Sequence, residues 1–146
     1  MRKHLERLVP HSAEQMLALV CDVESYPQFI PHCERMDVRR EFDRPNEKFD
    51  ARMHIRFGPI SQAYTSRITV DRDAMTLSAK SVDGPFSHLS SIWRFAEGGQ
   101  GTRIVFDIDF RIANPLIRSV AEPAFAAKQD EIMDAFVAEA NRRYAA

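Results

Sequence analysis

Asp107 and Asp109 form a candidate pair for acid/base chemistry, because they stand two residues apart in the segment TRIVFDIDFRI (102–112). Side chains two residues apart on a strand lie roughly 6 to 7 Å apart, a separation that suits acid/base catalysis on a sugar. Arg103 and Arg111 share this face of the strand, however, and cross-strand ion pairs would use the same carboxylates. We therefore interpret the pair as part of a solvated surface and predict no catalytic residues in it.

Nucleophilic and phosphate-binding chemistry lack their motifs in this chain. No G-x-S-x-G stands where a strand could turn into a helix. The glycine-rich segment EGGQGT (97–102) lacks the lysine of a phosphate loop and leads into a strand instead of a helix. This segment is typical of a hairpin turn. The sequence thus favours a protein that is not an enzyme.

Metal binding would have to use Cys21, Cys33 or His32, and their spacing does not suit it. Zinc sites place four Cys or His ligands at short intervals, and this chain has two cysteines. His32 and Cys33 are adjacent, so on an extended chain their side chains point apart. We predict reduced thiols, no metal and no cofactor.

Length and composition predict one globular domain over residues 1–146. A chain of this size can bury roughly 70% of the surface that it exposes when unfolded. Hydrophobic residues make up 45% of the chain and charged residues 28%, as in ordinary globular proteins. The N-terminal segment MRKHLERLVPH lacks the apolar region of a signal peptide, so we expect a cytoplasmic protein.

A row of basic residues forms a candidate contact face on the outer side of the predicted sheet. Such a face would suit RNA phosphate or an anionic membrane surface. The alternative is a solvated face balanced by acidic neighbours, which a net charge of −1 favours; the same charge argues against a DNA-binding protein. The basic residues are Arg39, Arg52, His54, Arg56 and Arg67.

Alternation of apolar and polar residues predicts most of the chain to be strands. Residues 47–58 and 102–112 alternate most clearly, and residues 3–9, 35–42, 60–70, 75–82 and 88–97 are further candidates. Turn signals at Pro45, Gly58–Pro59 and Gly84–Pro85 separate them. Short connections favour an antiparallel meander, because parallel pairing would need crossover helices.

Two segments have helical spacing. Ser12 and Gln15 form a capping box at the start of a helix over residues 12–23. Asn114 and Pro115 have the order of an N-cap and first helical residue, and the helix would run to Tyr144 with a kink or break at Pro123. A sheet covered by such a helix is an α+β architecture.

The segment DVESYPQFIPHCE (22–34) places two prolines and two aromatic residues where polar turn residues are usual. The chain also has ten Phe, many of them on the inward-facing side of the predicted strands. Such residues either pack a solid core or line a lipophilic cavity, and periodicity alone leaves both alternatives open.

Four motifs together resemble the coenzyme Q-binding proteins of the START-like superfamily of polyketide cyclases and lipid-transport proteins. The motifs are YPQFIPHCE from Tyr26, GPFSHLSSIWRF from Gly84, TRIVFDIDFRIANPL from Thr102 and MDAFVAEA near the end. They occur in the family's order and span nearly the whole chain. The family often has an aromatic residue where this chain has His32.

This resemblance implies one START-like domain with the helix-grip fold. A curved antiparallel sheet of about six to seven strands would wrap around the long C-terminal helix, with a short helical pair after the first strand. It also implies non-enzymatic binding of ubiquinone or a related isoprenoid lipid in support of respiration, with transient contact at the inner membrane of a bacterium. The same family includes ribosome-association toxins that bind the large ribosomal subunit, which is the alternative function. A polyketide cyclase or aromatase is less favoured, since the apolar ladders contain no clustered acid/base residues.

Carried onto this chain, the resemblance and the periodicity predict two sets of lipid-contacting residues. The predicted cavity wall is Phe49, Met53, Ile55, Phe57, Tyr64, Trp93, Phe95, Phe106, Ile108, Phe110, Ile132, Met133 and Phe136. The predicted gate, through which a lipid would pass, is Tyr26, Pro27, Phe29, Ile30, Pro31, Phe86, Leu116 and Ile117. Candidate hydrogen-bond donors to a headgroup are Tyr64, Ser66 and Ser91. The alternative is a purely structural role, in which Phe29 and Ile30 close one end of the core permanently.

Overall fold

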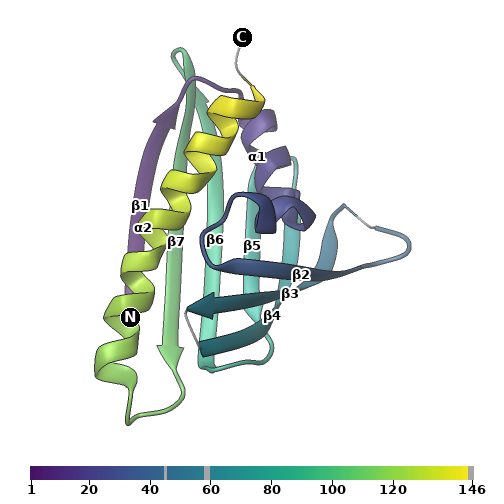
Figure 1. The fold of residues 1–146 in the computed structure, drawn as a ribbon. Coiled ribbons are helices and arrows are strands. Elements are labelled where there is room, and N and C mark those ends of the chain that lie inside the picture. Colours follow the sequence, from purple (N-terminus) through teal and green to yellow (C-terminus); the bar gives the residue numbers. More distant parts are fainter. Residues whose placement is uncertain (45, 58–59, 145–146) are drawn as a thin grey trace.

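The order of helices and strands follows the pattern of the sequence closely (Figure 1). The structure, a computed structural model, describes residues 1–44, 46–57 and 60–144, without the side chains of Phe57 and Ile60. The predicted turn residues Pro45, Gly58 and Pro59 lie outside this part. The elements are β1 (Arg2–Val9), α1 (Ala13–Cys21), the 3-10 helix η1 (Val23–Gln28), β2 (Cys33–Arg40), β3 (Lys48–Phe57), β4 (Ile60–Asp71), β5 (Thr76–Ser81), β6 (Phe86–Gly98), β7 (Gly101–Ile112) and α2 (Arg118–Arg143).

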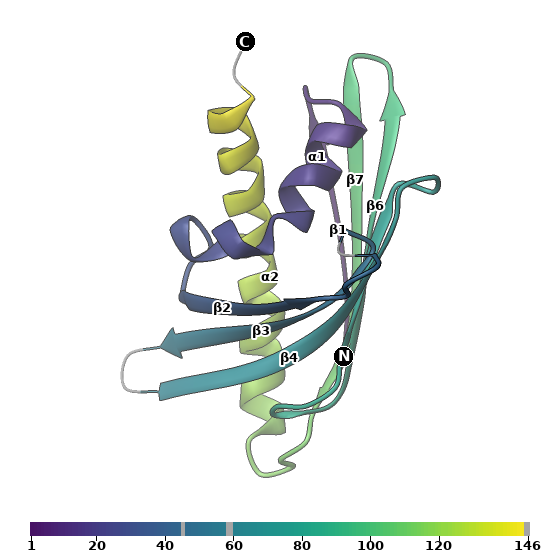
Figure 2. The ribbon, with the colours of Figure 1, turned by 90° about the vertical axis from the view of Figure 1, so that its right-hand side faces the viewer.

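The strands form one antiparallel sheet in the order β1-β7-β6-β5-β4-β3-β2. Six strands thus follow one another as a meander, and β1 closes the far side by pairing with β7. The sheet bends strongly, so that β2, β3 and β4 cross the direction of β6 and β7 in the view of Figure 1. In Figure 2, the curved sheet wraps around α2, and α1 and η1 cover one end.

The alternating pattern of β7 places its apolar side chains inside, as predicted. Ile104, Phe106, Ile108 and Phe110 are buried. Phe106 pairs with Leu5 on one neighbouring strand and with Trp93 on the other, so the inward row continues across three strands. Alternation of side chains between the two faces of a strand is the physical reason.

The predicted capping box at the start of α1 is present. The Ser12 hydroxyl accepts a hydrogen bond from the Gln15 backbone N–H at 3.1 Å, and the Gln15 side chain accepts one from the Ser12 N–H at 3.0 Å. This exchange satisfies two N–H groups that the first helical turn leaves unpaired. Met16 and Val20 then lie fully buried on the inner face of the helix.

The long helix begins later than its sequence predicts and does not break. Asn114 uses its side chain to accept from the Leu116 N–H at 2.9 Å, so residues 115–117 form a turn and α2 begins at Arg118. The prediction of an N-cap at Asn114 is therefore wrong. Pro123 lies inside one continuous helix, on its exposed side. The carbonyl that proline leaves unbonded, that of Ser119, belongs to an exposed residue near the helix start. A curved antiparallel sheet that holds this helix is the helix-grip fold.

Candidate functional site

A cavity of about 150 Å³ lies between the concave face of the sheet and α2. Its wall combines side chains of η1, of the middle strands and of one side of α2, and most of them are apolar. The wall residues are Val23, Tyr26, Ile30, Pro31, His32, Met36, Ala51, Met53, Ile55, Tyr64, Ser66, Ile68, Leu77, Ala79, Leu89, Ser91, Trp93, Phe106, Ile108, Phe125, Lys128, Gln129, Glu131, Ile132, Met133 and Phe136.

Small side chains at inward-facing positions explain why the space is hollow. Ala51, Ser66, Ala79 and Ser91 come from four consecutive strands, β3 to β6, and all line the cavity. Ala51 pairs with Ser66, and Ala79 pairs with Ser91, so they form two short rows across the floor. Larger residues in these places would reach toward α2 and fill the volume, as close-packed interiors normally do.

Tyr64 is a polar group of the cavity with a weak partner. Its hydroxyl donates to the Met53 sulfur at 3.7 Å, and a thioether is a poor acceptor. Burial raises the pKa of Tyr64 to about 12, so the hydroxyl stays protonated and remains a donor. Gly84, with φ +95°, packs closely against this strand, because a Cβ at Gly84 would collide with the Cβ of Tyr64.

The structure separates the predicted wall residues into two groups. Nine of them line the cavity: Met53, Ile55, Tyr64, Trp93, Phe106, Ile108, Ile132, Met133 and Phe136. Phe49, Phe95 and Phe110 lie instead in the packed core, with exposed fractions of 2%, 4% and 0%. Phe110 packs edge-on against Phe125 at 4.8 Å between ring centroids, which leaves no free surface toward the cavity. The side chain of Phe57 lies outside the described residues.

The η1 helix contributes Val23 and Tyr26 to the cavity wall, and the residues that follow it contribute Ile30 and Pro31. Tyr26 is buried and its hydroxyl donates to the Val20 carbonyl at the end of α1, so this ring is held from behind. Pro27 lies within η1, and it does not line the cavity. The predicted gate is therefore anchored on its α1 side.

Phe136 of α2 joins the η1 segment to the floor of the cavity. Its ring lies 5.2 Å from that of Tyr26, 5.4 Å from that of Phe29 and 5.0 Å from that of Trp93, all edge-to-face. Edge-to-face pairs at these separations are attractive beyond their buried area. Phe29 itself is half-buried and packs on Phe136 from the outer side.

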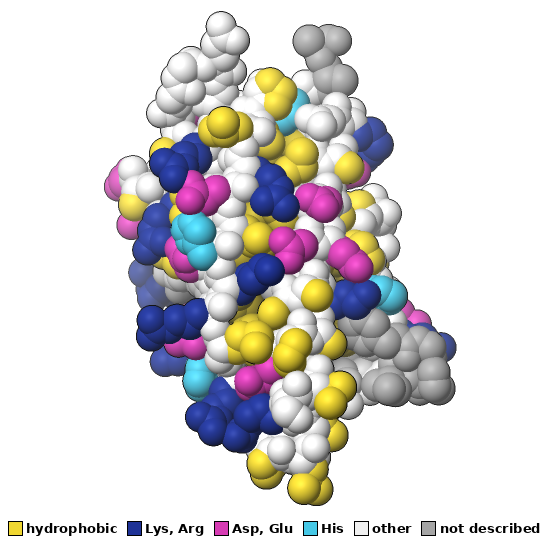
Figure 3. Space-filling view, turned by 90° about the vertical axis from the view of Figure 1, so that its left-hand side faces the viewer, with side chains coloured by type: hydrophobic (Ala, Val, Ile, Leu, Met, Phe, Trp, Pro, Cys, Tyr) yellow, Lys and Arg dark blue, Asp and Glu magenta, His cyan; other side chains and the backbone are white. Residues whose placement is uncertain are grey.

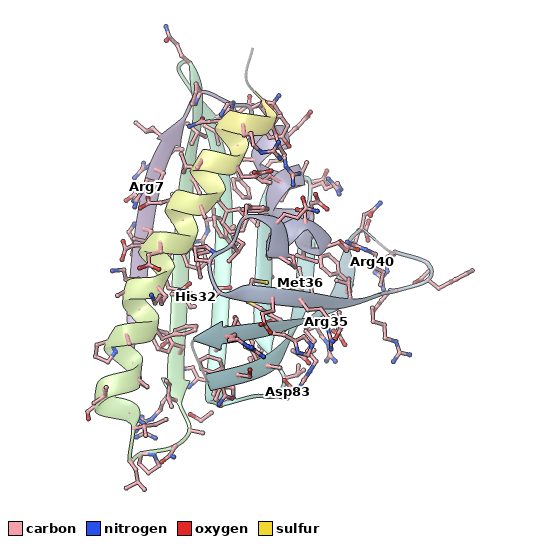
Figure 4. The ribbon with its side chains drawn as sticks, in the orientation of Figure 1. Arg7, His32, Arg35, Met36, Arg40 and Asp83 are labelled. Carbon is pink, nitrogen blue, oxygen red and sulfur yellow. The ribbon has the colours of Figure 1, made fainter. Side chains whose placement is uncertain are left out.

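The mouth of the cavity is formed by Pro31, His32, Lys128 and Glu131, which line it and are exposed or half-buried. His32 stands just before β2 and faces α2 (Figure 4). It adopts φ +67°, a left-handed conformation in which His is more common than most residues, and this turn directs the chain from η1 into β2.

The gate residues predicted at the start of the long helix lie away from the cavity. Leu116 is 89% exposed, Ile117 is 49% exposed, and neither lines it. Phe86 packs on Tyr64 at 5.3 Å and on Phe125 at 5.1 Å, behind the wall. Sequence reasoning missed Lys128, Gln129 and Glu131, whose helical spacing from Ile132 was the available signal.

A charged cluster fastens the last turns of α2 to η1. Glu139, with a side chain only 7% exposed, accepts hydrogen bonds from Arg142 at 2.6 Å and from Arg143 at 2.7 Å. Arg143 also donates to Asp22 at 3.0 Å and to the Ser25 hydroxyl at 2.9 Å. The hydrogen bonds from Arg142, and then from Arg143, lower the pKa of Glu139 from its ordinary 4.5 to about 2.

Replacing Glu139 with Gln should remove a stabilising contribution that depends on pH. Since its pKa is lower in the folded protein than in the unfolded chain, the contribution is complete above about pH 4.5 and is lost as the pH falls through about 2. We expect the variant to lose roughly 1.5 to 3 kcal/mol of unfolding free energy near neutral pH. Urea titrations at descending pH should show this difference shrinking.

Asp134→Asn is the matched control for this prediction, because Asp134 lies on the same helix with its side chain 70% exposed. Its effect should stay within about 0.5 kcal/mol. A Glu139→Gln loss that is the same at acid and neutral pH would contradict the assignment.

The predicted basic face is largely paired with acidic side chains. Arg52 lies 3.1 Å from Asp83 and Arg56 lies 2.9 Å from Glu34. The remaining predicted members are His54, which bonds Asp37 at 2.8 Å, Arg67, which lies 3.3 Å from Asp50, and Arg39, which is exposed on β2. Figure 4 shows Arg35 of β2 beside this group, where it also bonds Asp37. Charges of both signs therefore alternate on this face.

Asp107 and Asp109 form ion pairs on the outer face of the sheet. Asp107 bonds His4 at 2.6 Å and Arg94 at 3.2 Å, and Asp109 lies 3.4 Å from His88. The sequence predicted cross-strand ion pairs on this face without naming their partners, and Arg103 of the same strand bonds Glu6 on β1. Ion pairing is thus present, with partners that depend on the register between strands.

Two searches of the described residues gave negative findings. Nowhere in residues 1–44, 46–57 and 60–144 do three His, Cys, Asp or Glu side chains come together as metal ligands would. Every helix in the same part of the chain is too short or too polar to serve as a membrane span.

Comparison with known proteins agrees with this architecture. Residues 9–137 match the family described as polyketide cyclase / dehydrase and lipid transport. The ribosome association toxin RatA of Pseudomonas aeruginosa is 31% identical over 99% of both chains. The mitochondrial coenzyme Q-binding protein COQ10 of Drosophila melanogaster is 30% identical over 94% of this chain and 57% of its own.

Among solved structures, an aromatase/cyclase from Streptomyces sp. R1128 superposes with a TM-score of 0.82. The superposition covers 100% of this chain and 98% of that one, at 21% identity, so it shows the shared fold. The family match over most of the chain and the helix-grip fold lead to one assignment. The chain belongs to the polyketide cyclase / dehydrase and lipid transport family.

Proposed function

We propose that this protein binds a quinone-like isoprenoid lipid in the cavity beneath α2 and releases it unchanged at the bacterial inner membrane. The observation that carries the proposal is the hollow itself. Four small residues hold open an apolar space of about 150 Å³ where a packed core would otherwise form. The similarity to a coenzyme Q-binding protein supports a quinone over other lipids.

The size of the cavity fits a ring better than a whole lipid. An engineered apolar cavity of about 150 Å³ stays dry and binds benzene, which sets the scale for one ring. The isoprenoid tail would then leave through the mouth, between His32 and Lys128. Each methylene or methyl group withdrawn from water on the way contributes about 0.8 kcal/mol, before ordering costs.

The quinone carbonyls would accept hydrogen bonds from the floor of the cavity. Tyr64, Ser66 and Ser91 line the cavity, and among the described residues the Tyr64 hydroxyl has only the Met53 sulfur as a hydrogen-bond partner. A carbonyl oxygen is a stronger acceptor than a thioether, so ring binding would improve this hydrogen bond. The charged wall residues Lys128 and Glu131 belong to the mouth, which supports binding without acid/base chemistry on the ring.

A fluorescence titration tests this proposal directly, because Trp93 is the only tryptophan and lines the cavity. A short-chain ubiquinone should quench Trp93 with a saturating, one-site curve. Tyr64→Phe should weaken binding by roughly tenfold, the worth of about one hydrogen bond. The matched control is Tyr144→Phe, since that hydroxyl donates to the Gln15 carbonyl outside the cavity. Quenching that does not saturate, or that both variants weaken equally, would refute the proposed site.

Ribosome association is the second candidate function, and the full-length similarity to RatA favours it. If the basic face carries that contact, Arg52→Glu with Arg56→Glu should abolish cosedimentation with the large ribosomal subunit and leave quinone quenching intact. The paired carboxylates Asp83 and Glu34 lower the net positive charge that this face presents to RNA. Cosedimentation that survives both substitutions would exclude this face as the ribosome contact.

A further inference from the structure

An exposed apolar surface covers the start of the long helix. Three of the seven large hydrophobic side chains that are exposed among the described residues fall within residues 116–120. They are Leu116, Ile117 and Val120, exposed by 89%, 49% and 76%. Pro123, Ala124 and Ala127 continue the surface at helical spacing and are also exposed. We call these six residues the α2 apolar stripe.

The charged residues within this segment are turned toward the protein backbone. The Arg118 guanidinium donates to the Ile112 carbonyl at 2.9 Å, and the Glu122 carboxylate accepts from the Ile112 N–H at 2.8 Å. Both side chains thus complete the backbone hydrogen bonding at the end of β7. The outward side of this part of α2 is consequently left with apolar and small residues only, which is unusual for a solvent-facing helix.

Positive charge flanks the α2 apolar stripe. From Arg111 to Lys128 the chain has three basic residues and one acidic residue, although its net charge is −1. Arg111 is exposed at the end of β7. The side chain of Arg2 is 87% exposed and lies 3.6 Å from the Asp109 carboxylate. In Figure 3, hydrophobic side chains gather over the lower end of α2, with Lys and Arg side chains along the sheet next to them.

The shape of this end is a projection and not a groove. The connection from β7 to α2 extends beyond the rest of the sheet in both ribbon views (Figures 1 and 2). A projecting apolar tip with a basic border is suited to enter the headgroup layer of an anionic bilayer, where apolar insertion and attraction to anionic lipids act together. A folded protein partner would have to supply a complementary apolar groove.

We propose that the α2 apolar stripe docks the protein on an anionic phospholipid bilayer, with Arg2 and Arg111 against the headgroups. This inference rests on the proposed lipid-binding function, because docking here brings the cavity to the membrane. Phe125 lies on the opposite side of the same helical segment and lines the cavity, about 8 Å along the axis from Val120. A lipid leaving past Lys128 and Ile132 would emerge next to the docked surface.

Vesicle flotation tests the docking with the intact protein. Wild type should float with phosphatidylcholine vesicles that contain phosphatidylglycerol, and should bind pure phosphatidylcholine at least about tenfold more weakly. Leu116→Glu with Val120→Glu should lower binding to the anionic vesicles by about tenfold or more, because two charges replace inserted apolar side chains. Arg111→Glu should reduce the preference for anionic lipid.

The matched control is Leu8→Glu, since Leu8 is 82% exposed on β1. Its neighbour Arg7 pairs with Asp134, about 20 Å along the α2 axis from Val120, so Leu8 lies outside the α2 apolar stripe. It should bind vesicles within about twofold of wild type, as a substitution outside the docking surface would. A short-chain ubiquinone should quench Trp93 fluorescence equally in wild type and in the Leu116→Glu/Val120→Glu protein. If the ubiquinone does not quench Trp93 in wild type, the proposed lipid site is refuted, but the docking result is unaffected.

Three outcomes would overturn the docking proposal. The first is wild-type protein that does not bind anionic vesicles, and the second is equal binding by wild type and Leu116→Glu/Val120→Glu. The third would show that the α2 apolar stripe contacts a ribosome: wild type does not bind vesicles, and the double variant loses the cosedimentation with ribosomal subunits that wild type shows.

Discussion

Replacing Ser91 with Phe should abolish quinone binding and leave the protein folded. Ser91 faces the cavity from β6, in a row with Ala79 and Ile108, so a benzyl group there would occupy the volume that the quinone ring needs. Losing the burial of about four carbon groups should cost roughly 3 kcal/mol, which weakens binding by about a hundredfold. Trp93 quenching and thermal unfolding should be measured on the same protein.

Ser90→Phe provides the control, because Ser90 is the neighbouring residue on β6 and faces solvent. It should bind quinone as wild type does. Thermal stability of Ser91→Phe should fall little, since the added ring fills existing space and does not displace packed neighbours. A Ser91→Phe protein that is folded and still binds quinone with wild-type affinity would show that the ligand lies elsewhere.

Replacing Phe136 with Ala should be the most destabilising of the changes considered. Its ring contacts Tyr26, Phe29 and Trp93, and only 2% of the residue is exposed. Truncating a buried Phe typically costs about 3 to 5 kcal/mol. Urea unfolding followed by circular dichroism should show a corresponding fall in the free energy of unfolding. The η1 segment should also lose protection against hydrogen exchange, because its main contact with α2 has been removed.

Phe42→Ala is the reference for this measurement, since Phe42 is fully exposed and should contribute less than about 0.5 kcal/mol. An effect of Phe136→Ala no larger than that of Phe42→Ala would contradict the role given to Phe136. Normal exchange protection of η1 in a destabilised Phe136→Ala protein would show that Arg143 and Asp22 hold this segment without the aromatic contacts.

Local patterns in the sequence were sufficient for most of the elements. The alternation of Ile104, Phe106, Ile108 and Phe110 and the capping box at Ser12 each depend on residues close in the chain, and both predictions are confirmed. The predicted start of α2 was wrong because the Asn114 side-chain oxygen can either cap a helix or stabilise a turn. Only the path of the following residues distinguishes the two.

The cavity was harder to predict from the sequence. Alternation shows which face of the sheet a side chain lies on, but it does not show whether that part of the face borders the cavity or the packed core. Phe110 and Phe106 lie on the same face of β7, yet Phe106 lines the cavity and Phe110 packs beneath Phe125. Ala51 and Ala79 leave space for the cavity, but in the sequence each looks like any other inward-facing residue of a strand. Their meaning depends on the register that places small residues side by side on β3 to β6.

Long-range pairings account for the other differences. Asp107 bonds His4 because β1 lies next to β7, about a hundred residues away in the chain. Arg143 reaches Asp22 because the end of α2 packs on η1. Neither contact leaves a local pattern. For the same reason, the exposure of Leu116 and Ile117 could not be predicted from the sequence, because it depends on how α2 packs against the sheet.

Mass spectrometry of lipids extracted from protein purified from its native host tests the central claim most directly. We predict an isoprenoid quinone in wild-type protein and in Ser90→Phe protein, and its loss from Ser91→Phe protein purified in the same way. Folded wild-type protein that carries no isoprenoid lipid, or Ser91→Phe protein that carries as much as wild type, would contradict the account.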